Sequence, residues 1–288
     1  MPATGFQLKF LVRELPSASP FIKWVGGKRK VIPELLKDMP SVISHYYEPF
    51  VGGGALFFHL RSKGLLMDHS ITLSDTNLRL IRTYRAVRDN VEELIEKLKV
   101  HVDKHGPEHF YSVRASEVDR FKSDVDVASW FIYLNKTAFN GLYRVNKRNQ
   151  FNAPIGSYKN PRICDEDNLR ACSAALQTVE LRHAYFDHMR KEACEGDFVY
   201  FDPPYVPVSV TSNFTSYTKN GFGQLEQSML RDLAWDIRES GVRVVLSNAD
   251  HPLVRDLYSK FRLRRIEVGR AINCNGKARG SVGEVVIS

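Results

Sequence analysis

Residues 45–75 contain the pattern that most limits how this chain can fold. The segment "YYEPF" predicts a strand, "VGGG" a tight turn, "ALFFHLRSKG" a helix and "ITLSD" a second strand, which ends in Asp75. A strand, a glycine-rich turn, a helix and a strand ending in an acid are typical of the nucleotide-binding half of a doubly wound α/β sheet. Because ligands bind such sheets at the carboxyl ends of the strands, we expect the functional residues there.

The rest of the chain divides by its hydrophobic periodicity. From Asn77 to about Phe139 the periodicity is helical, and a polar, basic loop follows, "NGLYRVNKRNQFNAPIGSYKNPR". Strands and helices then alternate: "TVELRHA", a short helix from Phe186, "FVYFD", a helix over "GQLEQSMLRDLAWDIRESG" and "VRVVLSN", with "LRRIEVG" and "GEVVIS" as expected edge strands. A short helix is expected from about Arg29. We predict an extension over 1–20, an α/β domain over 21–77 and 162–288, and a helical insert over 78–161.

Charge and cysteine content narrow the class of protein. The formal net charge of +8 at pH 7 and the pI of about 9.3 favour a polyanionic partner such as nucleic acid. The four cysteines form no CxxC pair, so we expect reduced thiols in a cytoplasmic protein and no zinc site. No apolar run approaches the roughly 18 residues of a membrane span, and the first 16 residues are too charged for a signal peptide.

The segment "EPFVGGGALF" is a candidate ligand loop. Gly52, Gly53 and Gly54 allow a sharp turn and a close approach of the backbone to a ligand at a helix N-terminus. Asp75, at the end of the next strand, could accept hydrogen bonds from a ribose. The alternative is a loop shaped only for packing. A P-loop is excluded, because no serine or threonine follows the lysine of "GGKRK".

The segment "FVYFDPPYVP" indicates the chemistry. An apolar strand ends in a carboxylate and two prolines, which fix the backbone and supply carbonyls without amide hydrogens. The arrangement suits methylation of an exocyclic amine, a poor nucleophile. The Asp202 carboxylate and the Pro203 carbonyl could hold the amine hydrogens, and Tyr205 could stack on the base. Such a base must first leave its duplex. The alternative is a proline-terminated strand with a capping aspartate.

Taken together, these motifs resemble those of the Dam-type DNA adenine-N6 methyltransferases. The matching segments are "FIKWVGGKRK", "YYEPFVGGGALFFH", "LSDTNLRLI", "FNGLYRVNKRNQFNAPIGSY", "FVYFDPPY" and "GSVGEVVIS", which span about Phe21 to Ile287. The resemblance implies a Rossmann-like α/β sheet that binds S-adenosylmethionine, with a helical DNA-recognition insert. It implies direct transfer of a methyl group to adenine N6 in double-stranded DNA, with GATC as the expected site. No metal or obligate protein partner is expected, and the cell would be a bacterium or a phage-infected one.

The resemblance also assigns roles at matching positions. The cofactor site would be formed by Trp24, Lys28, Phe50, Gly52, Gly54 and Asp75. Lys28 would lie near the methionine carboxylate, and Asp75 would hold the ribose hydroxyls. The catalytic residues would be Asp202, Pro203, Pro204 and Tyr205, with Asp202 also lining the cofactor site. The alternatives are a core role for Trp24 and a solvated Lys28.

In this family the segment matching "FNGLYRVN" reads the target site. Phe139 would intrude into the base stack, Asn140 would contact a base or the backbone, and Arg144 would read a guanine through O6 and N7. Lys23 would contact a flanking base, and Pro154 a thymine methyl group. Phosphate contacts are expected from Lys136, Lys147 and Arg148. The alternative for the reading residues is a surface loop or phosphate contacts. The chain departs from some members at Ser157, where they carry an arginine.

Three further alternatives stay open. An RNA base N-methyltransferase could use a similar catalytic segment, and a catalytically inactive DNA-binding relative would keep the fold without the reaction. A strip of arginines recurs at every third residue after Asn77 and is either a solvated helix face or a phosphate track: Arg79, Arg82, Arg85 and Arg88.

Overall fold

The computed structural model describes residues 17–28, 30–67, 69–205, 222–268 and 282–288. Most of the predicted extension over 1–20 lies outside these residues, as does Arg29, where the first helix was expected to begin. The helix itself, α1, covers Ile32–Leu35, and Pro33 occupies its first turn, where proline is tolerated because the missing N–H has no helical partner.

The described residues form one seven-stranded sheet in the order β3-β2-β1-β4-β5-β7-β6. The strands are β1 (His45–Glu48), β2 (Ser70–Asp75), β3 (Val179–His183), β4 (Phe198–Phe201), β5 (Arg243–Ala249), β6 (Leu263–Val268) and β7 (Val282–Ile287). The first five are mutually parallel, and β7 runs antiparallel to both of its neighbours. The strand order reverses between β1 and β4, so their carboxyl ends form the switch point where open α/β sheets bind ligands.

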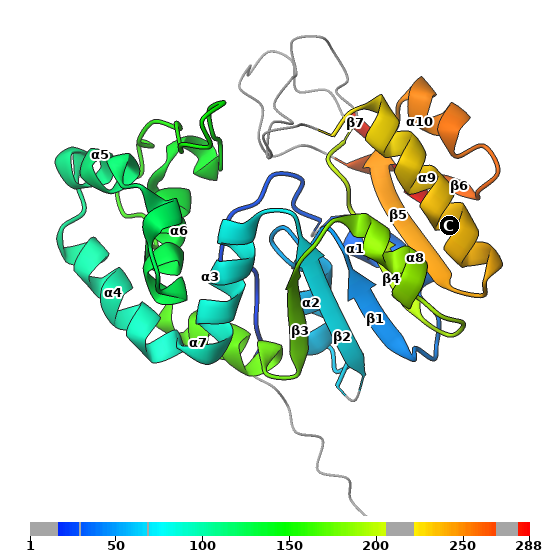
Figure 1. Ribbon diagram of the computed structural model, residues 1–288, viewed down its shortest axis with the longest axis horizontal. Coiled ribbons are helices and arrows are strands. Elements are labelled where there is room, and N and C mark those ends of the chain that lie inside the picture. Colours follow the sequence, from blue (N-terminus) through cyan, green and yellow to red (C-terminus); the bar gives the residue numbers. More distant parts are fainter. Residues whose placement is uncertain (1–16, 29, 68, 206–221, 269–281) are drawn as a thin grey trace, which may run out of the picture.

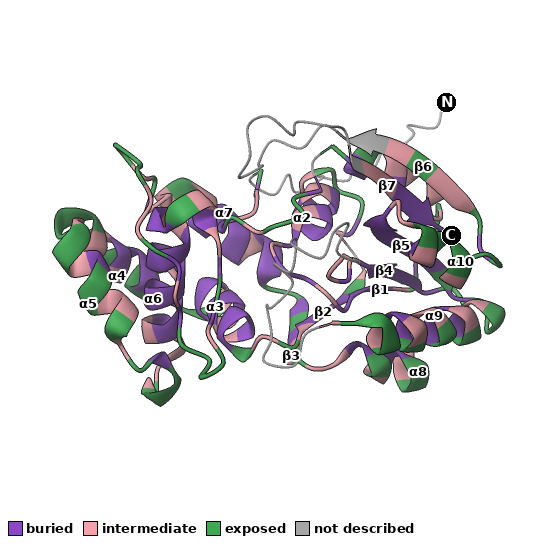
Figure 2. Ribbon diagram, turned by 90° about the horizontal axis from the view of Figure 1, so that it is seen from above, coloured by how far each residue is buried: buried purple, intermediate pink, exposed green. Residues whose placement is uncertain are grey.

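Helices cover both faces of the sheet and extend beyond its β3 edge. Around the sheet lie α1, α2 (Ala55–Ser62), α8 (Met189–Glu192), α9 (Gln224–Glu239) and α10 (Pro252–Leu257). Figure 2 shows α2 on one side of the sheet and α8 and α9 on the other. Beside the β3 edge stands a group of five helices, visible on the left of Figure 1: α3 (Leu78–Asp89), α4 (Val91–Asp103), α5 (Pro107–Ala115), α6 (Asp124–Thr137) and α7 (Glu166–Leu176).

The core consists of two clusters, one on each face of the sheet. Successive residues of a strand point to opposite faces, so Tyr46 joins one cluster and Tyr47 the other. The cluster of Tyr46 is continuous with the helical group, because it contains Tyr84 of α3 and Phe131 of α6. Each large apolar side chain buried in this way stabilises the fold by about 1.5–3 kcal/mol. The sheet and the helical group therefore share one continuous hydrophobic core.

The expected strands and most expected helices are present, with three differences. The segment "GEVVIS" is not an edge strand, because β7 lies between β5 and β6. Of the two segments expected at an edge, "LRRIEVG" alone is there, as β6. Two helices were not expected. In α7 three of the apolar positions are small alanines, which weakens its apolar pattern, and the six residues of α10 are too few to show helical periodicity.

The arginine strip of α3 is neither a solvated face nor an open phosphate track. Arg79 is buried and forms a two-pronged ion pair with Asp119, with nitrogen–oxygen distances of 2.7 and 2.6 Å. The other three are tied to partners within the chain: Arg82 donates to Asp124, Arg85 to the Leu181 carbonyl, and Arg88 to Asp89 and the Val179 carbonyl. These arginines fasten α3 to neighbouring segments.

Candidate active site

Asp202 follows directly after β4, at the carboxyl end of the sheet. Its Oδ1 lies 2.8 Å from Lys28 Nζ and accepts a hydrogen bond of 2.8 Å from Ser247 Oγ of the neighbouring β5. The Ser247 hydroxyl also lies 2.9 Å from Tyr200 Oη. Among the described residues no hydrogen bond to Oδ2 is found. Both polar contacts of the carboxylate thus involve Oδ1.

At the Lys28–Asp202 ion pair, burial and neighbouring charges shift the pKa values in opposite directions. Lys28 is only 3% exposed. Burial alone would lower the pKa of Lys28, but Asp202, Tyr200 and Glu284 outweigh it, and the pKa lies above its usual value. Burial raises the pKa of Asp202, although Lys28 and Ser247 oppose the rise. The ammonium therefore offsets part of the cost of keeping a charged carboxylate in this site.

The segment after Asp202 is held by buried polar groups. Gln227 of α9 donates to the Pro204 carbonyl at 3.0 Å and accepts from Asn248 of β5 at 3.1 Å. The Tyr205 hydroxyl donates to Glu284 of β7 at 2.9 Å, and Lys28 Nζ lies 4.5 Å from the centre of the Tyr205 ring. These contacts fix both the backbone after Pro203 and the direction of the aromatic ring.

The glycine loop forms the adjoining cradle. Gly52 has φ +47°, and a Cβ there would lie 2.6 Å from the Trp24 indole; Gly54 has φ +65°, and a Cβ there would lie 2.7 Å from Tyr84 Oη. Both positions therefore require glycine. Phe50 is half-buried and stacks on Phe186, with 5.5 Å between ring centres.

Asp75 closes the cradle from β2. Its carboxylate accepts from Gly52 N at 3.2 Å and from Asn77 N at 2.9 Å. Burial raises the pKa of Asp75 to about 6, because desolvation outweighs these two backbone hydrogen bonds. A fixed carboxylate beside a glycine turn fits a ribose diol, so the residues present fit an adenosyl cofactor.

A second carboxyl group lies close by. Glu48, at the end of β1, is buried and accepts from Tyr46 Oη at 2.7 Å. Burial raises the pKa of Glu48 to about 8, and the nearby charge of Asp202 adds to the rise. Glu48 therefore carries a proton over much of the neutral range.

Most of the expected DNA-contacting residues lie on a hairpin formed by residues 138–156. Antiparallel bridges join Ala138 to Ile155 and Val145 to Phe151. Phe139 is 44% exposed, and Asn140 adopts a left-handed conformation with φ 55°. Pro154 is exposed, as are Lys147 and Arg148 near the turn: these three keep the accessibility that a DNA contact needs.

Arg144 projects from this hairpin in a fixed orientation. Its Nε donates to Asn152 Oδ1 at 2.7 Å, and one terminal nitrogen donates to the Asn152 carbonyl at 3.0 Å. The side chain is exposed. A planar fork held in this way suits bidentate contact with a base edge.

Lys23 and Lys136 differ from the other expected DNA contacts. The Lys23 ammonium lies 3.9 Å from the centre of the Tyr158 ring, beside the hairpin. Lys136 is half-buried, and its pKa is lowered by burial and by the nearby charge of Lys23. Lys23 therefore lies with the hairpin, whereas Lys136 is less exposed than Lys147 and Arg148.

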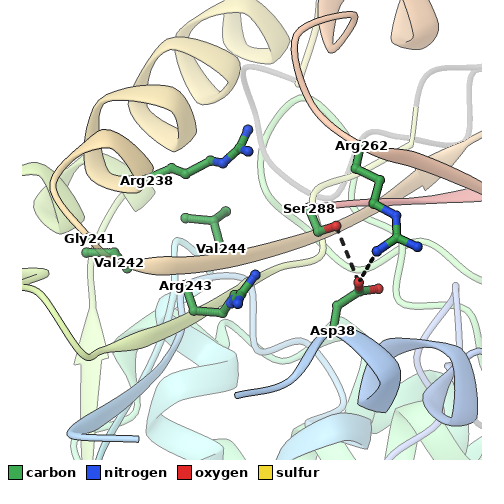
Figure 3. A pocket seen from close by; sticks show the side chains of 8 residues that line it. All are labelled: Asp38, Arg238, Gly241, Val242, Arg243, Val244, Arg262 and Ser288. Atoms are coloured by element: carbon green, nitrogen blue, oxygen red, sulfur yellow. Dashed lines mark hydrogen bonds and ion pairs between the residues drawn. The ribbon is translucent and has the colours of Figure 1, made fainter.

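The hollow drawn in Figure 3 lies away from these residues. It has a volume of about 360 Å³ and is lined by Arg243, Ser288 and Asp38 among others. Arg243 begins β5, whereas Ser247, which holds Asp202, lies toward the opposite end of that strand. The hollow thus lies at the amino end of β5, and the candidate active site lies at the carboxyl ends of the parallel strands.

Comparison with known proteins identifies the family. Residues 24–272 match the family described as D12 class N6 adenine-specific DNA methyltransferase. The chain belongs to this family. The D12 methyltransferase uses S-adenosylmethionine as its methyl donor and methylates adenine N6 in DNA.

Three relatives show how far the similarity extends. The type II methyltransferase M1.LlaDCHI of Lactococcus lactis subsp. cremoris is 41% identical over 93% of this chain and 94% of its own length. M.MjaIII of Methanocaldococcus jannaschii is 37% identical over 93% and 98%, and the DNA adenine methylase of Escherichia coli K12 is 31% identical over 92% and 93%. Among solved structures, the rRNA methyltransferase aviRa of Streptomyces viridochromogenes has 12% identity, covers 96% of this chain and 89% of its own, and has a TM-score of 0.35.

Sequence reasoning missed several residues of this D12 methyltransferase site. Ser247 and Glu284 hold Asp202 and Tyr205, and Gln227 holds the Pro204 carbonyl. Ser247 is the second-last residue of the expected strand "VRVVLSN" and Glu284 the second of the expected strand "GEVVIS", so both lie near strand ends, where the functional residues of such sheets are found. No comparable signal marks Gln227, because it lies within a helix.

No helix among the described residues is long and apolar enough to cross a membrane. In the same ranges, no three His, Cys, Asp or Glu side chains are grouped so that they could hold a metal ion.

Proposed function

We propose that this D12 methyltransferase acts on double-stranded DNA at GATC and flips the target adenine into the pocket formed by Asp202, Pro203, Pro204 and Tyr205. The observation that carries the proposal is the fixed carboxylate of Asp202, which lies beside the glycine cradle and is held by Lys28 and Ser247. An extrahelical base is required because adenine N6 is inaccessible inside a duplex.

The residues of the pocket act on the exocyclic amine. Asp202 Oδ2 and the Pro203 carbonyl accept the two N6 hydrogens, which favours a tetrahedral nitrogen with its lone pair directed at the methyl group. Tyr205 stacks on the base and is kept in its orientation by Glu284. S-Adenosylmethionine supplies the electrophilic methyl group when it is bound. As N6 gains positive charge, Asp202 is the nearest group able to stabilise it and accept a proton.

The residues around the cradle take different roles in binding the cofactor. Asp75 accepts the ribose hydroxyls, and the backbone of Gly52 and Gly54 allows close approach. Trp24 and Phe50 supply the aromatic walls. Lys28 was expected near the methionine carboxylate; its ammonium lies against Asp202, so we assign it first to stabilising that carboxylate.

The 138–156 hairpin reads the DNA in this proposal. Arg144, oriented by Asn152, contacts a guanine, and exposed Phe139 enters the space left in the base stack. Asn140, Pro154 and Lys23 contact neighbouring bases. Lys147 and Arg148 bind phosphates. Lys136 contributes to DNA binding at most by long-range electrostatic attraction.

The test uses labelled S-adenosylmethionine and four nucleic acids. They are a GATC duplex, the same duplex with N6-methyladenine at both target positions, a scrambled duplex and an RNA of the GATC sequence. We expect label in the first alone. Label in the scrambled duplex would reject GATC but keep the reaction, and label in the RNA would reject DNA selectivity. Label in the premethylated duplex would show that the target is a different atom.

A further inference from the structure

One buried amide links the N-terminal segment to the 138–156 hairpin. Asn135, near the end of α6, has no exposed surface. Its Oδ1 accepts from Lys23 N at 2.7 Å, and its Nδ2 donates to the Lys23 carbonyl at 2.8 Å and to the Gly141 carbonyl at 3.1 Å. Both amide hydrogens and the oxygen are thus committed, and every partner is a backbone group of another segment.

Lys23 and Gly141 also fit against each other directly. Gly141 has φ +65°, and a Cβ there would lie 2.4 Å from Lys23 Cδ and 2.8 Å from Lys23 Cβ. The far end of the same lysine lies over the ring of Tyr158, just beyond the hairpin. One side of the exposed Lys23 side chain therefore packs against the hairpin, and Asn135 holds the Lys23 backbone.

The segment that Asn135 holds continues into the active site. Trp24 follows at once, and its ring covers Gly52 and stacks on Tyr143 at 6.0 Å, next to Arg144 in sequence. Lys28, four residues further, reaches Asp202. In Figure 1 this dark-blue segment passes between the helical group and the sheet. Asn135 thus joins the hairpin to the segment that carries Lys28, the ion-pair partner of Asp202.

We propose that Asn135 is a positioning residue that sets the hairpin in register with the active site, so that correct contacts to the flanking bases are made in the same geometry that places adenine N6 against Asp202. A merely structural role would lower stability and affect all substrates alike. A positioning role lowers kcat for the correct site most, because wrong sites do not use the aligned contacts. The inference rests on the proposed reading role of the hairpin.

The first test compares Asn135→Ala with Thr137→Val. Thr137 is buried in the same helix, and among the described residues its hydroxyl bonds only to the Tyr133 carbonyl of that helix. Its carbonyl accepts from Gly156 N, a backbone contact that valine keeps, so the replacement removes a buried hydrogen bond and leaves the contacts of Asn135 with Lys23 and Gly141 in place. Single-turnover and steady-state rates are measured on the GATC duplex and on duplexes with one base pair beside the adenine replaced. Stability in urea and the Kd for S-adenosylmethionine are measured in parallel.

We expect Asn135→Ala to lower discrimination between correct and replaced sites at least tenfold, mainly through kcat, and to leave the cofactor Kd within about tenfold. Thr137→Val should leave discrimination unchanged. Equal loss on every duplex in Asn135→Ala, or equal loss of discrimination in both variants, would overturn the proposal.

A second pair keeps the test decisive if Asn135→Ala does not fold. Gly141→Ala disturbs the junction from the hairpin side, and Gly64→Ala imposes similar backbone strain at φ +71°, where the nearest side-chain atom is 4.0 Å from the added carbon. Loss of discrimination in Gly141→Ala alone supports the proposal. If Arg144→Ala relaxes discrimination but the junction variants do not, the present inference fails and the proposed function stands. If the wild-type enzyme itself does not discriminate, both fail.

Discussion

At the scale of single residues, Asp202 carries the largest share of the proposed chemistry. Its Oδ1 is occupied by Lys28 and Ser247, so replacing the side chain removes the proposed amine acceptor and leaves the buried Lys28 without its counter-ion. We expect Asp202→Ala to abolish methyl transfer while the Kd for S-adenosylmethionine stays within about tenfold. Labelled methyl transfer and calorimetric cofactor binding measure the two effects. Normal turnover in this variant would sink the mechanism.

Arg144 makes a separate prediction about site choice. Because Asn152 holds its guanidinium, Arg144→Ala should cost about 1–3 kcal/mol for the correct site and relax discrimination at one base pair. Lys147→Ala, also exposed in the hairpin, is the control and should weaken binding to all duplexes alike. Competition binding with duplexes substituted at each position measures both. Unchanged discrimination in Arg144→Ala would move the reading role elsewhere.

The raised pKa of Glu48 predicts that the stability of the fold depends on pH. Its pKa rises from 4.5 to about 8 on folding, so between these values the folded chain binds more protons than the unfolded chain. The free energy of unfolding should then fall as pH rises through this window, by at most about 1.4 kcal/mol per pH unit. Glu48→Gln stays neutral and should flatten the slope. Urea unfolding from pH 6.5 to 8 avoids most of the contribution of Asp75, whose pKa is about 6. Parallel slopes for the two proteins would contradict the assignment.

At the scale of elements, the arginines of α3 separate stability from DNA binding. Arg79 is buried and bonds to Asp119, the Tyr143 hydroxyl and the Asn149 carbonyl, so Arg79→Met should lower the free energy of unfolding by about 3 kcal/mol. Arg148→Ala should leave stability within about 0.5 kcal/mol and reduce the salt dependence of DNA binding by about one phosphate contact. Urea unfolding and binding titrations at several salt concentrations check both. A stability loss in Arg148→Ala equal to that in Arg79→Met would refute the distinction.

Local sequence patterns predicted the helices and strands better than they predicted which strands and side chains lie next to each other. The strand, glycine turn and acid around Asp75 are encoded within 31 residues, and "FVYFDPPY" within eight, so composition and periodicity suffice to place them. The pairing of β7 between β5 and β6 depends on contacts that no local pattern records. The same is true of the site: Ser247 reaches Asp202 across 45 residues, and Asn135 reaches Lys23 across 112.

At the scale of the whole molecule, the predicted boundary between α/β domain and insert lies inside a continuous core. The cluster of Tyr46 contains residues of β1 and β2 together with residues of α3, α4 and α6. Arg79 and Asn135 add polar ties between segments far apart in sequence. Separate folding of the insert would expose this shared apolar surface, so we expect the sheet and the helices to unfold together.

The three tryptophans allow this expectation to be tested. Trp130 lies in α6 and belongs to the cluster shared with the helices, whereas Trp235 lies in α9 and packs on the cluster of the other sheet face. Variants that keep only Trp130 or only Trp235, with phenylalanine at the other positions, report each region by fluorescence. We expect each variant's fluorescence transition in urea to coincide with its own transition by circular dichroism, which reports the whole chain. In each variant, S-adenosylmethionine at 100 times that variant's own Kd should shift both transitions together by about 2.7 kcal/mol, since the cofactor binds only the folded chain. A Trp130 transition that precedes the loss of overall secondary structure, or fails to shift with the cofactor, would show that the helical group unfolds on its own.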